Sequence, residues 1–417
     1  MKISYVVCAL SSKDVIVTFT LNLTFISTFY VIQLPVMENN KFAKVVSIVG
    51  ARPQFIKLAP LSKALREAGF KEVIVHTGQH YDDNMSELFF KELEIPEPDY
   101  NLGIGSGSHG EQTGRMLIAI EDILLKENPD LVIIYGDTNS TLAGALASSK
   151  LHIPLAHIEA GLRSFNKNMP EEINRIVADH LSSLLFAPTE TAVENLRREG
   201  IEKGVYLVGD IMFDALMHFS KISDAKSKIL EALNLKPKEY YLATIHRAEN
   251  TDNCERLKNI LEALSSLDKP VIFPVHPRTK KKVEEYNLEF LIEKIQVIEP
   301  VGYLDMIQLE KNAKAILTDS GGVQKEAFWL RVPCITLRDE TEWVETVRYG
   351  WNRLVGADKE KILDAVKSIS PGEEVDFINE YAARKICGII GEGGRNFEKE
   401  VMSKDLMKLF KQNIQGR

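Results

Sequence analysis

The chain has 417 residues, of which 45% are hydrophobic and 26% charged, and its 51 basic and 59 acidic side chains leave a net charge of −8. This composition is typical of a globular protein with about two domains, and it excludes a disordered chain and a collagen-like scaffold. The acidic balance argues against nucleic-acid binding. The four cysteines, Cys8, Cys254, Cys334 and Cys387, form no Cys-x-x-Cys pair. We therefore expect neither a zinc site nor a disulfide framework, and a reducing, cytoplasmic location.

Residues 15–36 carry no charged side chain, which is long enough for a membrane-spanning helix. Residues 17–25, however, alternate with the period of a strand. A secretory signal fits poorly, because it should begin with a more strongly basic segment, and Lys2 and Lys13 are the only basic residues before residue 15. Three interpretations remain: a membrane anchor, an additional strand, or a segment outside the fold because translation starts at Met37. We favour the third, so residues 1–36 are expected to be a non-core extension and the protein is not expected at a membrane.

From residue 44 onward, short β-branched runs alternate with amphipathic segments of helical length. Strands are predicted at 44–49, 72–76, 131–135, 154–158, 184–187 and 205–208, and helices at 54–68, 83–93, 111–127, 138–150, 171–183 and 189–199. After a helical segment near 213–233, a second series has strands at 240–245, 270–275, 295–298, 314–318 and 333–337, each followed by a helix.

Nearly continuous apolar strands that alternate with helices indicate parallel sheets covered on both faces. Two such series predict an α/β protein with two doubly wound, Rossmann-like domains that face a cleft. The first domain is expected at residues 37–210 and the second at 211–395. A last helix, predicted within 396–417, is expected to pack back on the first domain.

Polar clusters stand at six predicted strand ends, three in each series. In the first series they are Gly50-Ala-Arg52-Pro-Gln54, Gly136-Asp137-Thr138 and His157-Ile-Glu159-Ala-Gly-Leu-Arg163. In the second they are His246-Arg-Ala-Glu-Asn250, His276-Pro-Arg278 and Thr318-Asp-Ser320-Gly-Gly322. Because ligands of open α/β sheets bind beyond the carboxyl ends of the strands, these clusters predict where the functional site lies.

The segment Ser320-Gly321-Gly322 opens a predicted helix with small residues. Uncovered N–H groups at the positive end of the helix dipole suit a diphosphate, although an ordinary serine cap with a glycine turn also explains them. On the same helix, Glu326 is a candidate acceptor for two ribose hydroxyls; a solvated charge is the alternative. Across the cleft, Arg52 and Lys57 are candidate phosphate-binding cations, with surface charge as the alternative for Lys57.

Three acidic residues, Asp137, Glu159 and Glu171, occupy two strand ends and one helix start. Carboxylates gathered in one cleft have their pKa values driven apart, which is how acid and base roles are divided. Metal binding is the competing explanation, but no metal motif occurs: His157-x-Glu159 lacks the Pro-Cys-x-x-Cys of a deaminase. Each of the three residues taken alone also has a structural explanation. Glu171, for example, would lie in the first turn of a helix, where an acidic side chain is favourable. Together they predict an acid–base site without a metal.

Taken in order, the motifs resemble those of the non-hydrolysing UDP-N-acetylglucosamine 2-epimerases. They are Gly50-Ala-Arg-Pro-Gln-Phe-Ile-Lys57, Thr77-Gly-Gln-His80, Gly136-Asp-Thr, His157-Ile-Glu-Ala-Gly-Leu-Arg163, Pro170-Glu-Glu-Ile-Asn-Arg175, Thr244-Ile-His-Arg-Ala-Glu-Asn250, His276-Pro277 and Thr318-Asp-Ser-Gly-Gly322. The match runs from about residue 44 to the C-terminus and is specific as a combination. It implies the two-domain GT-B fold.

The resemblance also implies a reaction: reversible inversion at C2 of UDP-GlcNAc to give UDP-ManNAc, without cofactor or metal. UDP is eliminated while C2 loses its proton, and a bound 2-acetamidoglucal is then reprotonated on the other face. The family is usually dimeric, so a homodimer is expected. By motif position, Asp137, Glu159 and Glu171 are the acid–base carboxylates, and His246 assists the departure of the diphosphate.

The remaining roles that the resemblance implies concern binding. Phosphates are held by Arg52, Lys57, Ser320, Gly321 and Gly322, the ribose by Glu326, and a further part of the nucleotide by His276. Arg175, Gln79 and His80 line the cleft. Some bacterial members have a second, regulatory UDP-GlcNAc site near Gln79 and His80.

One departure from the commonest pattern is Gly-Ala-Arg-Pro-Gln54, where the family usually has Gly-Thr-Arg-Pro-Glu. This form also resembles a branch that acts on UDP-2,3-diacetamido-2,3-dideoxy-glucuronate. The substrate therefore stays open between the two nucleotide sugars, and so does allosteric activation. A GT-B glycosyltransferase is a less favoured alternative, and a non-catalytic sugar-nucleotide sensor is the least favoured.

Overall fold

In the computed structural model of the protein, the structure describes residues 3–11, 14–23, 26–34, 43–79, 90, 92–375 and 381–393. Two compact units divide the chain, and the larger one is Lys44–Cys387. In the other unit, β1 (Ile3–Ser11), β2 (Asp14–Leu23) and β3 (Ile26–Leu34) form an antiparallel sheet in that order. The alternating segment found in the sequence thus falls largely in strand β2. Among the described residues, no helix has the length and apolar character needed to cross a membrane.

The first parallel sheet of the larger unit has seven strands in the order β10-β9-β8-β7-β4-β5-β6. They are β4 (Lys44–Val49), β5 (Lys71–His76), β6 (Tyr100–Asn101), β7 (Leu131–Tyr135), β8 (Leu155–Ile158), β9 (Leu184–Ala187) and β10 (Val205–Leu207). Every pairing is parallel. The chain moves outward from β4 in one direction and then returns to start again at β7, so the strand order reverses between these two neighbours.

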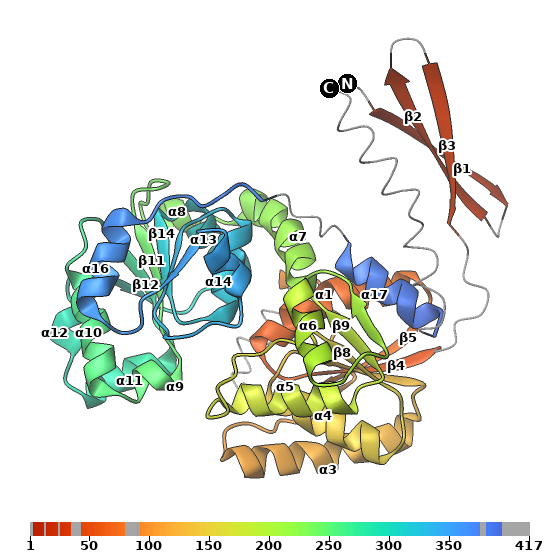
Figure 1. Ribbon diagram of the computed structural model, residues 1–417, viewed down its shortest axis with the longest axis horizontal. Coiled ribbons are helices and arrows are strands. Elements are labelled where there is room, and N and C mark those ends of the chain that lie inside the picture. Colours follow the sequence, from red (N-terminus) through yellow and green to blue (C-terminus); the bar gives the residue numbers. More distant parts are fainter. Residues whose placement is uncertain are drawn as a thin grey trace. The chain divides into compact units, whose positions relative to one another are not determined.

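Helices cover both faces of this sheet because its strands are apolar on both sides. They are α1 (Arg52–Glu67), α3 (His109–Glu127), α4 (Asn139–Lys150), α5 (Pro170–Leu181) and α6 (Glu190–Arg198). Side chains of α3 and α4 pack on Val46, Ile48, Val132 and Ile134. Figure 1 shows α3 and α4 below the sheet and α1 above it.

The second parallel sheet has six strands in the order β13-β12-β11-β14-β15-β16. They are β11 (Tyr241–Thr244), β12 (Val271–Pro274), β13 (Gln296–Ile298), β14 (Ala315–Thr318), β15 (Cys334–Thr336) and β16 (Asn352–Leu354). All pairings are again parallel. Here the strand order reverses between β11 and β14.

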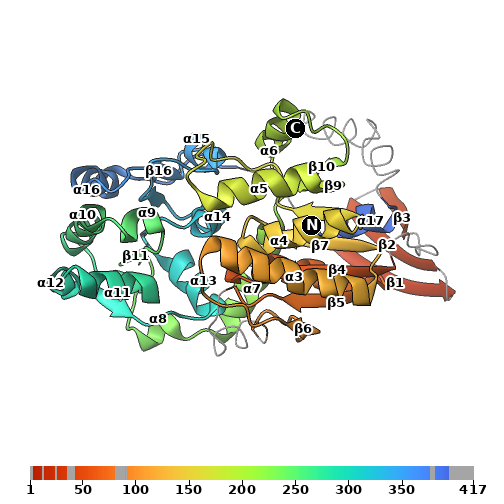
Figure 2. The ribbon, with the colours of Figure 1, turned by 90° about the horizontal axis from the view of Figure 1, so that it is seen from below.

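The helices of this second half are α7 (Ile211–Lys226), α8 (Ile229–Ala232), α9 (Ala248–Thr251), α10 (Cys254–Ser265), α11 (Pro277–Glu285), α12 (Glu289–Ile292), α13 (Tyr303–Asn312), α14 (Gly321–Trp329), α15 (Val344–Arg348) and α16 (Lys359–Ser368). The last described helix, α17 (Ala382–Gly391), returns to the first half, where Cys387 Sγ donates to the Ala64 carbonyl of α1. Figure 2 shows α10, α11 and α12 grouped beside β11.

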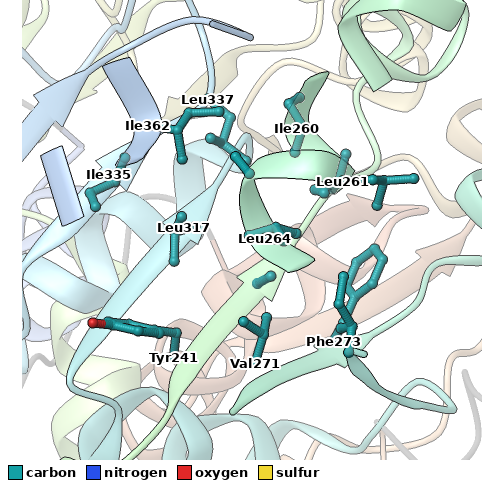
Figure 3. Packing of buried hydrophobic residues seen from close by; sticks show 14 of the residues in the cluster. Tyr241, Ile260, Leu261, Leu264, Val271, Phe273, Leu317, Ile335, Leu337 and Ile362 are labelled. Atoms are coloured by element: carbon teal, nitrogen blue, oxygen red, sulfur yellow. The ribbon is translucent and has the colours of Figure 1, made fainter. Parts of the chain in front are cut away.

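Successive side chains along the strands of the second sheet point to opposite faces, and each face has its own hydrophobic core. Tyr241 and Ala243 face one side, where α10 and α16 contribute Leu261 and Ile362 (Figure 3). The residues between them, such as Leu242, face the opposite side with α13 and α14. Both faces are therefore buried, as parallel strands require.

The α/β fold with two doubly wound parallel sheets is confirmed, and the predicted strands from residue 44 to 337 are present with no end shifted by more than one residue. Two predicted helices fall wholly or mostly outside the described residues: 83–93, of which only 90, 92 and 93 are described, and the one within 396–417. The predicted domain boundaries stay predictions.

Candidate functional site

The predicted polar clusters lie at the two positions where strand order reverses. The turn after β4 leads directly into Arg52, the first residue of α1, and the loop after its neighbour β7 carries Asp137. In the second sheet, the loop after β11 carries His246 and the loop after its neighbour β14 carries Ser320. Loops that leave neighbouring strands in opposite directions open a crevice between them, where ligands of such sheets bind.

Asp137 follows a glycine whose conformation is restricted. Gly136 has φ +59°, and a Cβ added there would lie 3.2 Å from Lys57 Nζ. The Asp137 carboxylate is paired with Arg175 Nη2 at 2.5 Å, and 28% of its side chain is exposed. Arg175 Nη1 lies 3.2 Å from Glu172. Asp137 is thus oriented by a buried arginine yet open to a ligand on one side.

Glu159 lies at the end of β8 and is almost completely enclosed, with 8% of its side chain exposed. Its carboxylate is bonded to Lys57 Nζ at 2.7 Å and to Lys325 Nζ at 2.9 Å. Burial raises the pKa of a carboxyl, but the two lysines outweigh it and lower the pKa of Glu159 to about 2. The residue also has a left-handed φ of +74°, a strained conformation that persists only where the surroundings enforce it.

Glu171 and Glu172 open α5 next to each other and do different things. Glu172 is buried and accepts hydrogen bonds from the backbone N–H groups of Ser164 and Phe165, both at 2.9 Å. Glu171 is 37% exposed and lies 3.6 Å from Arg247 Nη1, which belongs to the second sheet's half. Glu171 is therefore the member of the pair that faces the cleft.

His246 is held at the end of β11 through the buried carboxylate of Asp319. Asp319 accepts hydrogen bonds from the backbone N–H groups of His246 and Arg247 at 3.0–3.1 Å. Its Oδ1 also lies 3.4 Å from His246 Nδ1. The His276 ring lies beside His246, with centroids 5.7 Å apart. Although 38% of the His246 side chain is exposed, the crowding of protein around the ring lowers its pKa and Asp319 opposes this.

Ser320 caps α14, and its hydroxyl accepts a hydrogen bond from Val323 N–H. A Cβ on Gly321 would lie 2.3 Å from Glu342 Oε1, so any larger residue there would displace the Glu342 side chain. Glu342 is in turn paired with Arg338 Nη2 at 3.0 Å. Burial opposes ionisation of Glu342, but Arg338, Arg175 and Arg247 lower its pKa to about 2. Cationic side chains from both halves thus surround this helix start.

Glu326 is buried and accepts a hydrogen bond from Tyr303 OH at 2.8 Å. Its neighbours are Arg52, from the other half of the cleft, and Glu310. Burial and the charge of Glu326 raise the pKa of Glu310 well above its ordinary value. The structure thus places Arg52 and Glu326 together, and Glu326 is not a solvated helix charge.

Gln54 and Gln79 make structural contacts within the first half. The Gln54 side chain accepts from the N–H groups of Gly50 and Ala51 and donates to the Tyr135 carbonyl at 2.8 Å. Gln79 Oε1 accepts from both the N–H and the hydroxyl of Ser140. His80 lies outside the described residues. Within the described part of the chain, no group of three or more His, Cys, Asp or Glu side chains is arranged to hold a metal ion.

The sequence reasoning missed several residues of this site: Lys325, Asp210, Arg247, Asp319, Arg338 and Glu342. A signal existed for Lys325, which is the one basic residue in the helical segment that opens with Gly321 and Gly322 and carries Glu326. Asp319 and Arg247 were inside quoted motifs. Glu342 and Arg338 lie beyond the last predicted strand, and no local pattern marks them.

Comparison with known proteins agrees with this geometry. A family model described as UDP-N-acetylglucosamine 2-epimerase matches residues 63–391. A UDP-N-acetylglucosamine 2-epimerase homolog of Methanococcus maripaludis is 62% identical over 335 residues, which are 79% of this chain and 94% of the relative. The UDP-2,3-diacetamido-2,3-dideoxy-D-glucuronate 2-epimerase of Pseudomonas aeruginosa is 53% identical over 333 residues, 78% of this chain and 92% of that protein.

Among solved structures, the crystal structure of Methanocaldococcus jannaschii UDP-GlcNAc 2-epimerase in complex with UDP-GlcNAc and UDP is similar, with a TM-score of 0.80. The two are 52% identical, and the match covers 84% of this chain and 100% of that one. The family model spans most of the chain and includes five of the six strand-end clusters. The chain therefore belongs to the UDP-N-acetylglucosamine 2-epimerase family.

Proposed function

We propose that the protein inverts C2 of UDP-N-acetylglucosamine to give UDP-N-acetylmannosamine, reversibly and without a cofactor. The observation that carries the proposal is that carboxylates on one side of the crevice stand opposite a helix start on the other side. Asp137, Glu159 and Glu171 supply carboxylates from the first sheet, and α14 of the second sheet supplies a helix start that opens with Ser320. Removal of a proton next to a departing diphosphate needs both.

The proposed reaction starts at C2. A carboxylate takes the C2 proton while the C1–O bond to UDP breaks, which leaves 2-acetamidoglucal and UDP bound together. The departing negative charge is stabilised by Arg52, by the backbone N–H groups of Gly321 and Gly322, and by His246. A second carboxyl group, which is protonated at this stage, then delivers its proton to the opposite face of C2 and becomes a carboxylate, and UDP adds back to C1.

Binding roles follow the same division. Glu326 is proposed to receive the ribose hydroxyls and His276 a further part of the nucleotide. Lys57 is proposed to act beside the phosphates, with its charge also balancing that of Glu159. Arg175 is proposed to line the sugar site through its pairing with Asp137. Gln79 and His80 are proposed for a second, regulatory nucleotide site.

The uronate UDP-2,3-diacetamido-2,3-dideoxy-glucuronate is the alternative substrate. The support is the 53% identity to the Pseudomonas aeruginosa enzyme of that name, close to the 55% identity to the Methanocaldococcus jannaschii UDP-N-acetylglucosamine 2-epimerase. The reaction type is the same for both sugars, so the carboxylates keep their proposed roles in either case.

The test is incubation of the protein in D₂O with each nucleotide sugar alone, followed by NMR. Deuterium at C2 together with a manno product from UDP-GlcNAc supports the main proposal. Turnover of the diacetamido uronate without turnover of UDP-GlcNAc supports the alternative substrate. A glycosyltransferase requires an acceptor, so absence of product from both sugars without an acceptor contradicts a 2-epimerase.

We also propose a cytoplasmic homodimer that acts on free UDP-sugar. The proposal of a cytoplasmic location rests on the wide spacing of the four cysteines in the sequence, which is typical of a reducing compartment. Sedimentation of the purified protein measures its oligomeric state directly.

A further inference from the structure

Lys325 joins three parts of the larger unit that are far apart in the sequence. It lies on α14, one residue before Glu326. Its ammonium group is 2.9 Å from Glu159 Oε2, at the end of β8, and 2.6 Å from Asp210 Oδ2, at the start of α7. Asp210 also caps α7, because its other oxygen accepts a hydrogen bond from Met212 N–H at 2.9 Å.

The surroundings of Lys325 exclude water. All three charged side chains of the bridge are buried. The ammonium group lies 3.8 Å from the centroid of the Trp343 ring and 5.3 Å from that of Trp329, within the range of cation–π attraction. Charges buried in this way interact strongly, and the loss of one partner destabilises the fold because it leaves a charge without compensation.

The charges around Glu159 balance within a closed group. Lys57 on α1 contacts Oε1 and Lys325 on α14 contacts Oε2, so each oxygen has its own cation. No other charged side chain among the described residues forms an ion pair with this carboxylate. Two cations and two carboxylates, the second being Asp210, give a net charge of zero.

We propose that Lys325 is a positioning residue that fixes the Glu159 carboxylate as an anion, and that it ties the helix of the Ser320-Gly321-Gly322 loop to the carboxylates of the first sheet. The role in turnover rests on the proposed function. Glu159 then works as a stationary negative charge at the end of β8, while proton transfer is left to Asp137 and Glu171, which are more exposed to the cleft.

Three variants separate this role from a merely structural one. Lys325→Arg keeps the charge. Asp210→Asn keeps Lys325 on Glu159 but removes its second partner. The double variant Lys325→Met with Asp210→Asn removes one cation and one carboxylate, so the buried group stays neutral and the fold is not left with an unpaired charge. Binding of UDP by calorimetry checks that each variant is folded.

The protonation of Glu159 is measured by NMR of protein labelled with ¹³C at the glutamate carboxyl carbons, with the Glu159 signal identified by its loss in Glu159→Gln. We expect no titration of this signal between about pH 4 and 8 in the unaltered protein, in Lys325→Arg or in Asp210→Asn. In the double variant the pKa of Glu159 rises by about 2 to 3 units, which brings its titration to about pH 4 or above, because one neighbouring cation is gone.

Turnover is measured on the same proteins with the nucleotide sugar that the unaltered protein accepts. We expect kcat of the double variant to fall on the acid side in step with protonation of Glu159, while KM changes little. An unmoved Glu159 signal in the double variant overturns the proposal, as does a moved signal without loss of kcat. A raised pKa of Glu159 in Lys325→Arg also contradicts the proposal, as does a rise in Asp210→Asn that equals the rise in the double variant. If the unaltered protein turns over neither sugar, the proposed function fails, and the NMR titration still decides whether Lys325 fixes the charge.

Discussion

At the scale of single residues, the site separates neighbours that look alike. Glu171 and Glu172 are adjacent acids at the start of α5, yet one faces Arg247 across the cleft and the other anchors the loop before the helix. Successive helical residues point about 100° apart, so only one of two adjacent side chains can reach the cleft.

We predict that Glu171→Gln lowers kcat at least ~100-fold, the size expected for loss of an acid–base group, with little change in thermal stability. Asp137→Asn is expected to do the same while UDP binding survives. The matched change Glu172→Gln lowers the free energy of unfolding by about 1–3 kcal/mol, because buried N–H groups lose a charged acceptor. Initial rates and urea unfolding measure the two effects. Near-normal rates in both Glu171→Gln and Asp137→Asn would show that these two carboxylates do not transfer the proton.

At the scale of elements, the turn from β4 into α1 depends on a close approach of three segments. A Cβ on Gly50 would lie 1.9 Å from Thr77 Oγ1 and 2.3 Å from Ser140 Oγ, at the end of β5 and the start of α4. Gln54 closes the same turn from inside α1. The position of Arg52 at the cleft follows from this packing.

We predict that Gly50→Ala destabilises the protein by about 1–3 kcal/mol, because an added methyl group forces packed elements apart. Gly114→Ala is the control: it lies within α3, and a Cβ there meets nothing within 4 Å. That change is expected to stabilise the fold by roughly 0.4–1 kcal/mol. Urea unfolding of both variants compares them; equal effects would contradict the packing argument.

At the scale of the whole molecule, the described site residues lie between Arg52 and Glu342, and the strands β1 to β3 belong to a different compact unit. We predict that a chain starting at Met37 folds and retains the kcat and KM of the full chain. Far-UV circular dichroism and initial rates test this. Loss of activity in a folded, shortened chain would show that the N-terminal strands take part in function.

The buried carboxylates make the stability of the whole protein depend on pH. The pKa values of Glu159 and Glu342 are about 2 in the folded state, below the ordinary value. The folded protein therefore binds fewer protons than the unfolded chain between about pH 4.5 and 2, and its stability falls as the pH falls through that range. The pKa of Glu310 is raised in the folded state, so above the ordinary pKa of glutamate the folded protein binds more protons than the unfolded chain. The contribution of Glu310 to stability therefore falls as the pH rises above that value.

We predict that the free energy of unfolding decreases from about pH 4.5 to pH 3, and that the decrease is smaller in Glu342→Gln, which has no carboxylate to protonate there. Urea unfolding across this pH range measures both slopes. If the free energy of unfolding falls equally with pH in the unaltered protein and in Glu342→Gln, Glu342 is excluded as a source of the pH dependence.

Much of this molecule was determined by local sequence pattern. Apolar strand runs and helical periods are properties of neighbouring residues, so the two parallel sheets and their polar strand ends were predictable one segment at a time. The short strands β6 and β16 were not predicted, because their sequences, Tyr-Asn and Asn-Arg-Leu, contain no β-branched run and form a strand only beside a neighbouring strand.

The tertiary structure alone decided which charges meet. Glu159 is paired with Lys325, 166 residues away, and Glu171 with Arg247 of the other sheet. Such pairs depend on burial and on packing between distant elements, which shift the pKa values and the positions of side chains that look alike in the sequence. The sequence by itself thus determined the fold class and the family motifs, and folding determined how the charges across the cleft are arranged.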